Sequence, residues 1–172
     1  MPNTPVASDA FCNYVSGFVD GEGCFSVSFN RRVTLRTGWE VRPSFSVSQN
    51  ADRAEVLHML VDYFRCGGIR PDRSDKTLKY EVRDIRNLVD SVIPHFRSYP
   101  LLSSKRLDFD RFAAVCERVS TGDHLTVAGF REIAALALLM NPSGKRKFTA
   151  SELLESDEVK VIVSASSNGG ES

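Results

Sequence analysis

A carboxylate between two glycines is the feature of this sequence best suited to catalysis. Glu22 follows Gly21 and precedes Gly23, at the end of a segment with helical character. Glycine frees the backbone, so two copies of this segment in a dimer could bring two carboxylates together. Paired carboxylates suit a divalent cation, because Mg²⁺ prefers one or two carboxylates with water and phosphate oxygens. The plainer interpretation is a helix C-terminus with a tight turn, where Gly, Asp and Glu are common, and residue types alone favour it.

Small residues make one side of the preceding helix nearly flat. Asn13, Gly17 and Gly21 are spaced four residues apart, and side chains at that spacing share one helix face. A flat face allows the backbone of a second helix to approach closely, as small residues at this spacing generally do. The spacing therefore predicts a homodimer whose interface includes Asn13, Gly17 and Gly21.

Two runs of alternating apolar and polar residues, Cys24–Arg32 and Glu40–Ser48, follow the helix. A period of two predicts two strands, each with one buried face. A polar two-stranded ribbon fits the DNA major groove, where Arg, Asn and Ser can read base edges, although many sheet faces are simply solvated. With two shorter strands, the DNA-binding candidates are Ser26, Ser28, Asn30, Arg32, Glu40, Arg42, Ser44, Ser46, Ser48, Arg70, Asp72, Lys79, Glu81 and Arg83.

The other periodic segments predict helices and the two shorter strands. The first helix is expected to start at a Ser8 or Asp9 cap and to end near Asp20. Asp52 and Glu55 resemble a capping box at the start of a second helix. Later segments are predicted as strands at Ile69–Arg73 and Leu78–Arg83 and as helices at Asp84–Val92 (ended by Pro94), Lys105–Ser120 and Thr126–Met140. The order αββαββα, followed by more helices, predicts an α+β fold with an antiparallel sheet covered by helices on one face.

The charge distribution permits nucleic-acid binding although the formal net charge is zero. The segment 152–172 holds five acidic residues and one basic residue, so it carries −4 and the rest of the chain +4. A mildly basic body allows contact with phosphates without requiring it. Three consecutive basic residues are expected in a solvent-facing loop from which they could touch phosphates: Lys145, Arg146 and Lys147.

Composition narrows the remaining function classes. No apolar run approaches the length of a membrane span, no secretory signal precedes the first helix, and the four cysteines form no CxxC pair. Reduced, buried thiols in an intracellular protein are therefore expected. The three histidines are isolated and form no zinc pattern. Trp39 lies beside a turn and could anchor either a loop or a DNA contact.

The segment Val15–Gly23 resembles the LAGLIDADG motif of homing endonucleases, in its form Gly-Phe-Val-Asp-Gly-Glu-Gly. Residues 17–23 match that form, and Val15 and Ser16 replace the usual Leu and Ala. Further stretches resemble the family's second strand, the segment before its later helix and a stretch near its C-terminus, namely Phe45–Gln49, Pro100–Phe109 and Met140–Arg146. The resemblance covers about residues 11–154, and one motif is present.

The resemblance implies an αββαββα fold with a saddle-shaped sheet, and a site-specific, intron-encoded double-strand DNA endonuclease. One motif per chain implies a homodimer, without a membrane or a small-molecule substrate as partner. Mg²⁺ is the implied cofactor, with Mn²⁺ tolerated and Ca²⁺ supporting binding without cleavage. By the same resemblance Glu22 is the metal-ligating acid and the Gly21 carbonyl a second ligand. Gln49 would order water and Lys105 would be the basic helper, although some relatives carry Lys at the position of Ser103.

Two other functions remain open at this point. One is a non-cleaving DNA- or RNA-binding relative, such as an intron maturase, although an intact Glu22 favours the enzyme. The other is an α+β protein that binds no nucleic acid and dimerises through the glycine face of its first helix. The expected organisation is a domain at residues 8–155 followed by an acidic, polar and flexible tail at 156–172.

Overall fold

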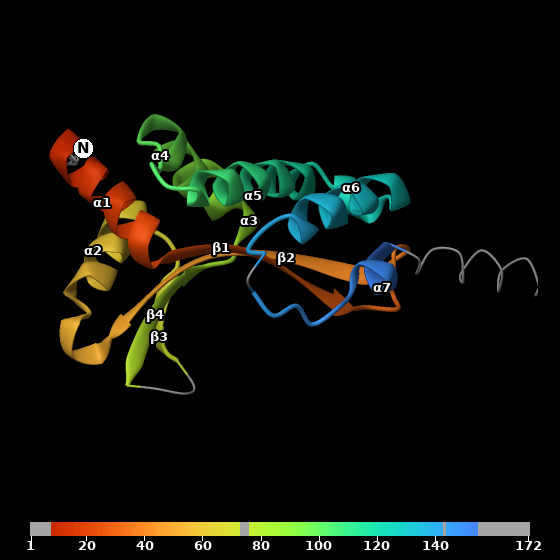
Figure 1. The fold of residues 1–172 in the computed structure, drawn as a ribbon, viewed down its shortest axis with the longest axis horizontal. Coiled ribbons are helices and arrows are strands. Elements are labelled where there is room, and N and C mark those ends of the chain that lie inside the picture. The colour runs from red at the N-terminus through yellow and green to blue at the C-terminus, as the bar shows by residue number, and fades with distance from the viewer. Residues whose placement is uncertain (1–7, 73–75, 143, 155–172) are drawn as a thin grey trace, which may run out of the picture.

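A four-stranded antiparallel sheet forms one layer of the molecule (Figure 1). The computed structural model describes residues 8–72, 76–142 and 144–154 of the 172-residue chain, so the predicted tail at 156–172 lies outside the described residues. The strands are ordered β1-β2-β4-β3 and span Gly23–Arg31 (β1), Trp39–Asn50 (β2), Gly68–Pro71 (β3) and Thr77–Val82 (β4). Every pairing is antiparallel, which confirms the predicted α+β class.

The helices cover one face of this sheet and leave the other open (Figure 1). They span Asp9–Glu22 (α1), Glu55–Phe64 (α2), Ile85–Asn87 (α3), Ile93–Ser98 (α4), Lys105–Ser120 (α5), Val127–Leu138 (α6) and Ala150–Leu154 (α7). α1 and α2 lie at one end of the sheet, and α5 and α6 lie above β1 and β2. The order through α3 is the predicted αββαββα.

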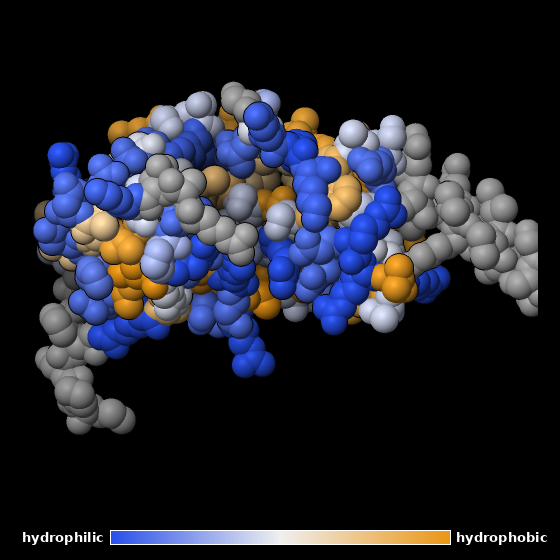
Figure 2. Space-filling view, turned by 90° about the horizontal axis from the view of Figure 1, so that it is seen from below, coloured by the Kyte–Doolittle hydropathy of each residue, from blue (hydrophilic) through white to orange (hydrophobic). Residues whose placement is uncertain are grey.

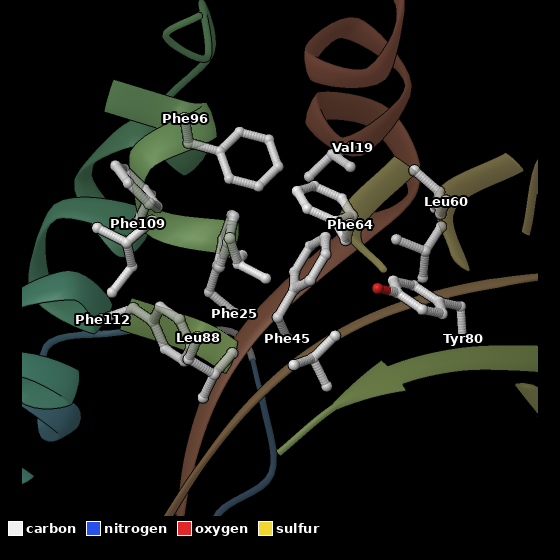
Figure 3. Packing of buried hydrophobic residues seen from close by; sticks show 14 of the residues in the cluster. Val19, Phe25, Phe45, Leu60, Phe64, Tyr80, Leu88, Phe96, Phe109 and Phe112 are labelled. Carbon is white, nitrogen blue, oxygen red and sulfur yellow. The ribbon is translucent and has the colours of Figure 1, made fainter. Parts of the chain in front are cut away.

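Aromatic rings fill the space between the two layers (Figure 3). Phe25 on β1 stacks on Phe45 of β2 at 5.2 Å between ring centroids, and Phe96, Phe109 and Phe112 lie 5.3 Å from it. These residues are at most 3% exposed. Burying such large apolar side chains is the main favourable term in folding, and it fixes which face of β1 and β2 is inward.

A second core cluster lies at the far end of the β1–β2 hairpin. Trp39 is 0% exposed and stacks parallel to Phe130 of α6, and the Arg31 guanidinium lies 4.1 Å from the Trp39 ring. Trp39 is therefore a core residue, which decides between the two roles that the sequence left open for it.

Several helix boundaries differ from the predictions made from sequence. α1 continues to Glu22, because the Gly23 N–H still bonds the Val19 carbonyl and keeps the last turn closed. α2 is capped by Ala54 without a side-chain bond, because Asp52 belongs to the 3₁₀ turn Ala51–Arg53 and the predicted capping box does not form.

Pro94 does not end its helix as predicted. A π-helical turn at Leu88–Val92 joins α3 to α4, and the Ile93 N–H bonds the carbonyl of Leu88 five residues back. This change of register leaves Pro94 in the first turn of α4, where its missing N–H is not needed. The helical segment therefore runs on to Ser98.

A buried chain of polar groups fixes α1 against α2 and α4. The Ser16 hydroxyl donates to the Tyr99 carbonyl (2.7 Å), so His95 Nε2, 3.1 Å from Ser16 Oγ, must be the donor to it. His95 Nδ1 then accepts from the Tyr63 hydroxyl (2.8 Å), whose oxygen lies 3.3 Å from Cys12 Sγ. His95 is thus held neutral in one tautomer, and burial lowers its pKa to about 4.

This neutral histidine predicts a loss of stability in mild acid. Above pH 6.5 His95 is neutral in both states, whereas between pH 6.5 and 4 only the unfolded chain takes up the proton. The free energy of unfolding should therefore fall by roughly 1–3 kcal/mol between pH 7.5 and 5. Urea unfolding at both pH values measures it. His95→Gln should lower the free energy of unfolding at pH 7.5 but make it depend less on pH. If the free energy of unfolding falls equally with pH in the wild type and in His95→Gln, the proposed role of His95 is wrong. Substituting the exposed His58 is the control.

Candidate active site and nucleic-acid interface

The sequence Gly21-Glu22-Gly23 forms the junction between α1 and β1. Glu22 is the last residue of α1 and is exposed. A Cβ at Gly23 would lie 2.5 Å from Val19 Cγ1 and 2.8 Å from the Val19 carbonyl oxygen, so packing requires glycine there. A Cβ at Gly17 or Gly21 would meet nothing within 4 Å. Of Gly17, Gly21 and Gly23, packing within the chain therefore requires glycine only at position 23.

Lys105 lies at the carbonyl end of α1. Its Nζ donates to the carbonyls of Gly23 (2.7 Å), Val19 (3.0 Å) and Gly21 (3.4 Å). A cation at this position is favoured, because the last carbonyls of a helix are unpaired and carry partial negative charge. The structure thus brings the predicted basic residue, Lys105, next to Glu22.

Asp20 connects the same end of α1 to the loop before α5. Its carboxylate accepts from the Leu102 N–H (3.1 Å) and from the Ser103 N–H (2.9 Å) and hydroxyl (2.5 Å). Burial by itself would raise the pKa of Asp20, but these hydrogen bonds outweigh it and lower the pKa below its ordinary value. Ser103 is thus a structural partner of Asp20, and together they tie the loop before α5 to the end of α1.

One chain supplies only part of a metal-binding site. In the part of the chain that the structure describes, no three His, Cys, Asp or Glu side chains are grouped to hold an ion. The Glu22 carboxylate and the Gly21 carbonyl are hard oxygen donors, and Mg²⁺ takes one or two protein ligands of this kind with water and phosphate. The donor set therefore fits Mg²⁺ if nucleic acid and a second copy of the chain complete the site.

The predicted reading residues lie on the open face of the sheet (Figure 2). The register pairs Ser28 with Arg42 and Ser46 with Glu81, both on the side away from the helices. Figure 2 shows hydrophilic residues gathered over the middle of this face. A shallow depression in it is lined by Glu22, Cys24, Ser26, Ser28, Arg42, Pro43, Ser44, Ser46, Ser48, Lys79, Glu81 and Arg83. The carboxylate of the motif and the reading residues therefore share one surface.

The charged residues of this face form ion pairs with one another, some between strands and some along one strand. Glu40 contacts both Arg32 (3.2 Å) and Arg42 (3.4 Å). Glu81 likewise contacts two arginines, and Asp72 lies 3.6 Å from Lys79. The sequence placed these residues on one face but did not show that they would be paired.

Gln49 lies near the C-terminal end of β2. It pairs with Leu78 in the register, two residues beyond the buried Val47, and so lies on the opposite side of β2 from Ser48. It is also outside the lining of the depression that holds Glu22. The role of Gln49 rests on the family resemblance alone.

The basic run at residues 145–147 follows the edge strand β1 along a groove it shares with Ser26, Ser28 and Asn30. The Arg146 guanidinium donates to the carbonyls of Leu138 (3.0 Å) and Met140, so it caps the end of α6.

Asn141 was not found from the sequence as a functional residue. Its side-chain amide donates to the Phe25 carbonyl (2.8 Å) at the edge of β1. Asn141 has a left-handed backbone (φ 46°), which Asn tolerates better than most residues. The Asn-Pro pair in the sequence marks a turn at this position and was the signal that could have indicated it.

An open antiparallel sheet with a carboxylate at the junction of its first helix and strand defines a known class of nucleic-acid enzymes. A family model described as LAGLIDADG endonuclease matches residues 15–116, more than half of the chain. The protein therefore belongs to the LAGLIDADG endonuclease family.

Relatives of known name agree with this assignment. The chain is 35% identical to the homing endonuclease I-ApeII of Aeropyrum pernix, over 59% of this chain and 60% of that protein. It is also 35% identical to an uncharacterised 50.9 kDa protein in ND4 intron 1 of Podospora anserina, over 66% of this chain. The matches cover about a quarter of that protein and of two intron-encoded endonucleases of Neurospora crassa described as probable.

Solved structures share the fold over almost the whole chain. The homing endonuclease I-TnaI is 32% identical, with a TM-score of 0.74 over 86% of this chain and 96% of its own. The archaeal intron-encoded homing endonuclease I-Vdi141I, complexed with DNA, is 25% identical, with a TM-score of 0.83 over 90% of this chain and 98% of its own.

Within the described residues, none of the helices has the length and apolar composition that crossing a membrane requires.

The close approach at Gly23 predicts a clear difference between two glycines. Gly23→Ala should lower the free energy of unfolding by about 1–3 kcal/mol, because the added methyl group overlaps Val19 in a packed core. Gly68→Ala is the matched control, since a Cβ there meets nothing within 4 Å and should change stability by no more than about 0.5 kcal/mol. Urea unfolding of both variants measures this, and equal losses would contradict the proposed contact.

Proposed function

We propose that this protein is a homing endonuclease: a site-specific, metal-dependent enzyme that cuts both strands of a DNA duplex as a homodimer. The observation that carries the proposal is the position of Glu22. It ends α1 beside the Lys105 ammonium and lines the depression in the polar sheet face. A pure binding protein does not need a carboxylate facing phosphates at this place.

Relatives support the DNA substrate and the divalent cation. I-Vdi141I was solved with DNA, and I-SmaMI was solved on an uncleaved DNA target in the presence of calcium ions. We propose Mg²⁺ as the working ion, with Mn²⁺ tolerated and Ca²⁺ supporting binding without cleavage. Glu22 and the Gly21 carbonyl would hold the ion, and its chemistry there is to activate water and stabilise the leaving oxygen.

The residues around this position have separate roles in the proposal. Lys105, held 2.7 to 3.4 Å from three carbonyls, keeps a positive charge beside the reacting phosphate and offsets its negative charge. Asp20 and Ser103 keep the α5 end of this arrangement in place. We retain Gln49 as a water-ordering residue only on the strength of the family resemblance.

The homodimer follows from the single motif. Each chain has one Glu22, and cutting two strands requires two such sites. The exposed face of α1 at Asn13, Gly17 and Gly21 would pack against its copy, since a Cβ at either glycine would meet nothing within this chain.

We propose that the open sheet face reads the DNA bases and that flanking cations contact phosphates. Lys145 and Lys147 are exposed beside β1 and would bind phosphate oxygens, whereas Arg146 is engaged by the end of α6. Phosphate contacts fix position and base contacts carry specificity. Two copies of the face would double the length of duplex that is read.

Removing the Glu22 charge should abolish cleavage while DNA binding remains. Glu22→Gln keeps size and hydrogen bonding but removes the anionic ligand, so cleavage should fall at least about a hundredfold. Affinity should stay the same or rise, because one phosphate-repelling charge per subunit is lost. Glu22→Asp should keep part of the activity, and a chelator should stop the wild type.

Cleavage of a target selected from a randomised DNA library with Mg²⁺ measures this, together with a binding assay in Ca²⁺. Glu132→Gln is the control, since Glu132 pairs with Arg118 in the helix layer, away from the sheet. A Glu22→Gln protein that cuts at the wild-type rate ends the catalytic assignment. Binding without cleavage by the wild type would identify the non-cleaving alternative.

A bulky side chain at Gly17 should separate the subunits. Gly17→Leu adds a branched side chain to the proposed helix–helix contact, and its Cβ would meet nothing in its own chain. A folded monomer or an aggregate should therefore replace the dimer. Sedimentation equilibrium measures the mass. Ala135→Leu on the exposed side of α6 serves as control and should leave the dimer intact. An unchanged dimer in Gly17→Leu would show that α1 is not the interface.

A further inference from the structure

Glu81 is an acidic residue near the middle of a surface proposed to face phosphates. It lies on β4, opposite Ser46 of β2 on one side and Gly68 of β3 on the other. Its side chain is 13% exposed, much less than those of its basic neighbours.

Three donors hold this carboxylate in place. Oε2 accepts from Arg70 Nε (3.1 Å), and Oε1 accepts from the Ser44 hydroxyl (3.1 Å) and lies 3.0 Å from an Arg83 terminal nitrogen. Ser44 lies on β2, Arg70 lies on β3, and Arg83 directly follows β4. Burial alone would raise the pKa of Glu81, but the bonds from Arg70 and Ser44 and the charge of Arg83 lower it, so the carboxylate stays ionised at neutral pH.

The two arginines keep donor groups that Glu81 does not use. Arg70 binds the carboxylate through Nε, so its two terminal nitrogens are not part of that bond. Arg83 uses one terminal nitrogen and is 60% exposed, and Arg70 is 44% exposed. A guanidinium held by a carboxylate is already oriented, so it loses less conformational freedom when it binds a base edge.

We infer that Glu81 is a positioning residue for DNA sequence readout, which orients Arg70 and Arg83 toward guanine in the major groove. This inference rests on the proposed function. Arginine recognises guanine through O6 and N7 with two parallel donors, and that geometry needs a fixed plane. The acid is compatible with a DNA surface because two positive charges surround it.

The pair around Glu40 is a weaker arrangement of the same kind. Glu40 contacts Arg32 and Arg42 at 3.2 and 3.4 Å, and its side chain is 28% exposed. Within the described residues, no serine hydroxyl donates to Glu40 as Ser44 does to Glu81. The more buried and more fully bonded carboxylate, Glu81, therefore carries the inference.

The test selects the duplexes that each variant binds from a randomised DNA library in the presence of Ca²⁺ and compares the base preferences of the variants. The selected duplexes are then tested for cleavage in the presence of Mg²⁺. Glu81→Gln keeps the size of the side chain but removes the charge that holds both guanidiniums. Preference for guanine should relax about tenfold at one or two positions of each half-site, and other positions should be unchanged. Glu117→Gln, which breaks the 2.6 Å pair with Arg97 in the helix layer, is the matched control and should change no position.

A second background separates positioning from direct contact. In a protein that already carries Arg70→Ala and Arg83→Ala, Glu81→Gln should produce no further change in preference, because there is nothing left to orient. A change at the same position in that background would show that Glu81 touches a base itself and would overturn the inference. An equal loss at all positions, or no change, would overturn it as well. Selection without subsequent cleavage by the wild type would reject the proposed endonuclease but leave this inference standing.

Discussion

The attachment of the carbonyl end of α1 to the start of α5 is the constraint on which the rest of the site depends. Lys105 bonds three carbonyls there, and Asp20 accepts from the loop at Leu102 and Ser103. These bonds place Glu22 at the edge of the sheet while the outer face of α1 stays free. A single junction therefore sets both the position of the carboxylate and the surface available to a second copy.

Buried polar groups hold this helix from the other side. The chain from Ser16 through His95 to Tyr63 satisfies every member with a partner, and such networks fix one arrangement more than they add net stability. Apolar side chains can shift against one another and stay in contact, whereas these hydrogen bonds form in only one arrangement of the two helices. α1 is thus bonded at both its middle and its end, which suits the role proposed for it in a dimer interface.

The open face combines opposite charges in a surface whose proposed partner is an anion. Glu40 and Glu81 each contact two arginines, one from the direction of the neighbouring strand (Arg32, Arg70) and one two residues further along their own chain segment (Arg42, Arg83). Exposed ion pairs contribute little to stability, so their more important effect is on the orientation of the arginines. Loose cations would bind any phosphate, whereas oriented guanidiniums can distinguish bases.

Period-two patterning by itself determined the two long strands, their inward faces and the polar set that shares the open face, because one face had to be buried. The motif residues also determined the family. Only the tertiary structure decided that Trp39 is core and that Pro94 is accommodated after a π-helical turn. Local rules for caps and breakers failed at these points because neighbouring elements supply or remove the partners. The contacts of Lys105 with the end of α1 and of Ser44 with Glu81 join residues far apart in the chain, and sequence spacing does not give the distance between such residues.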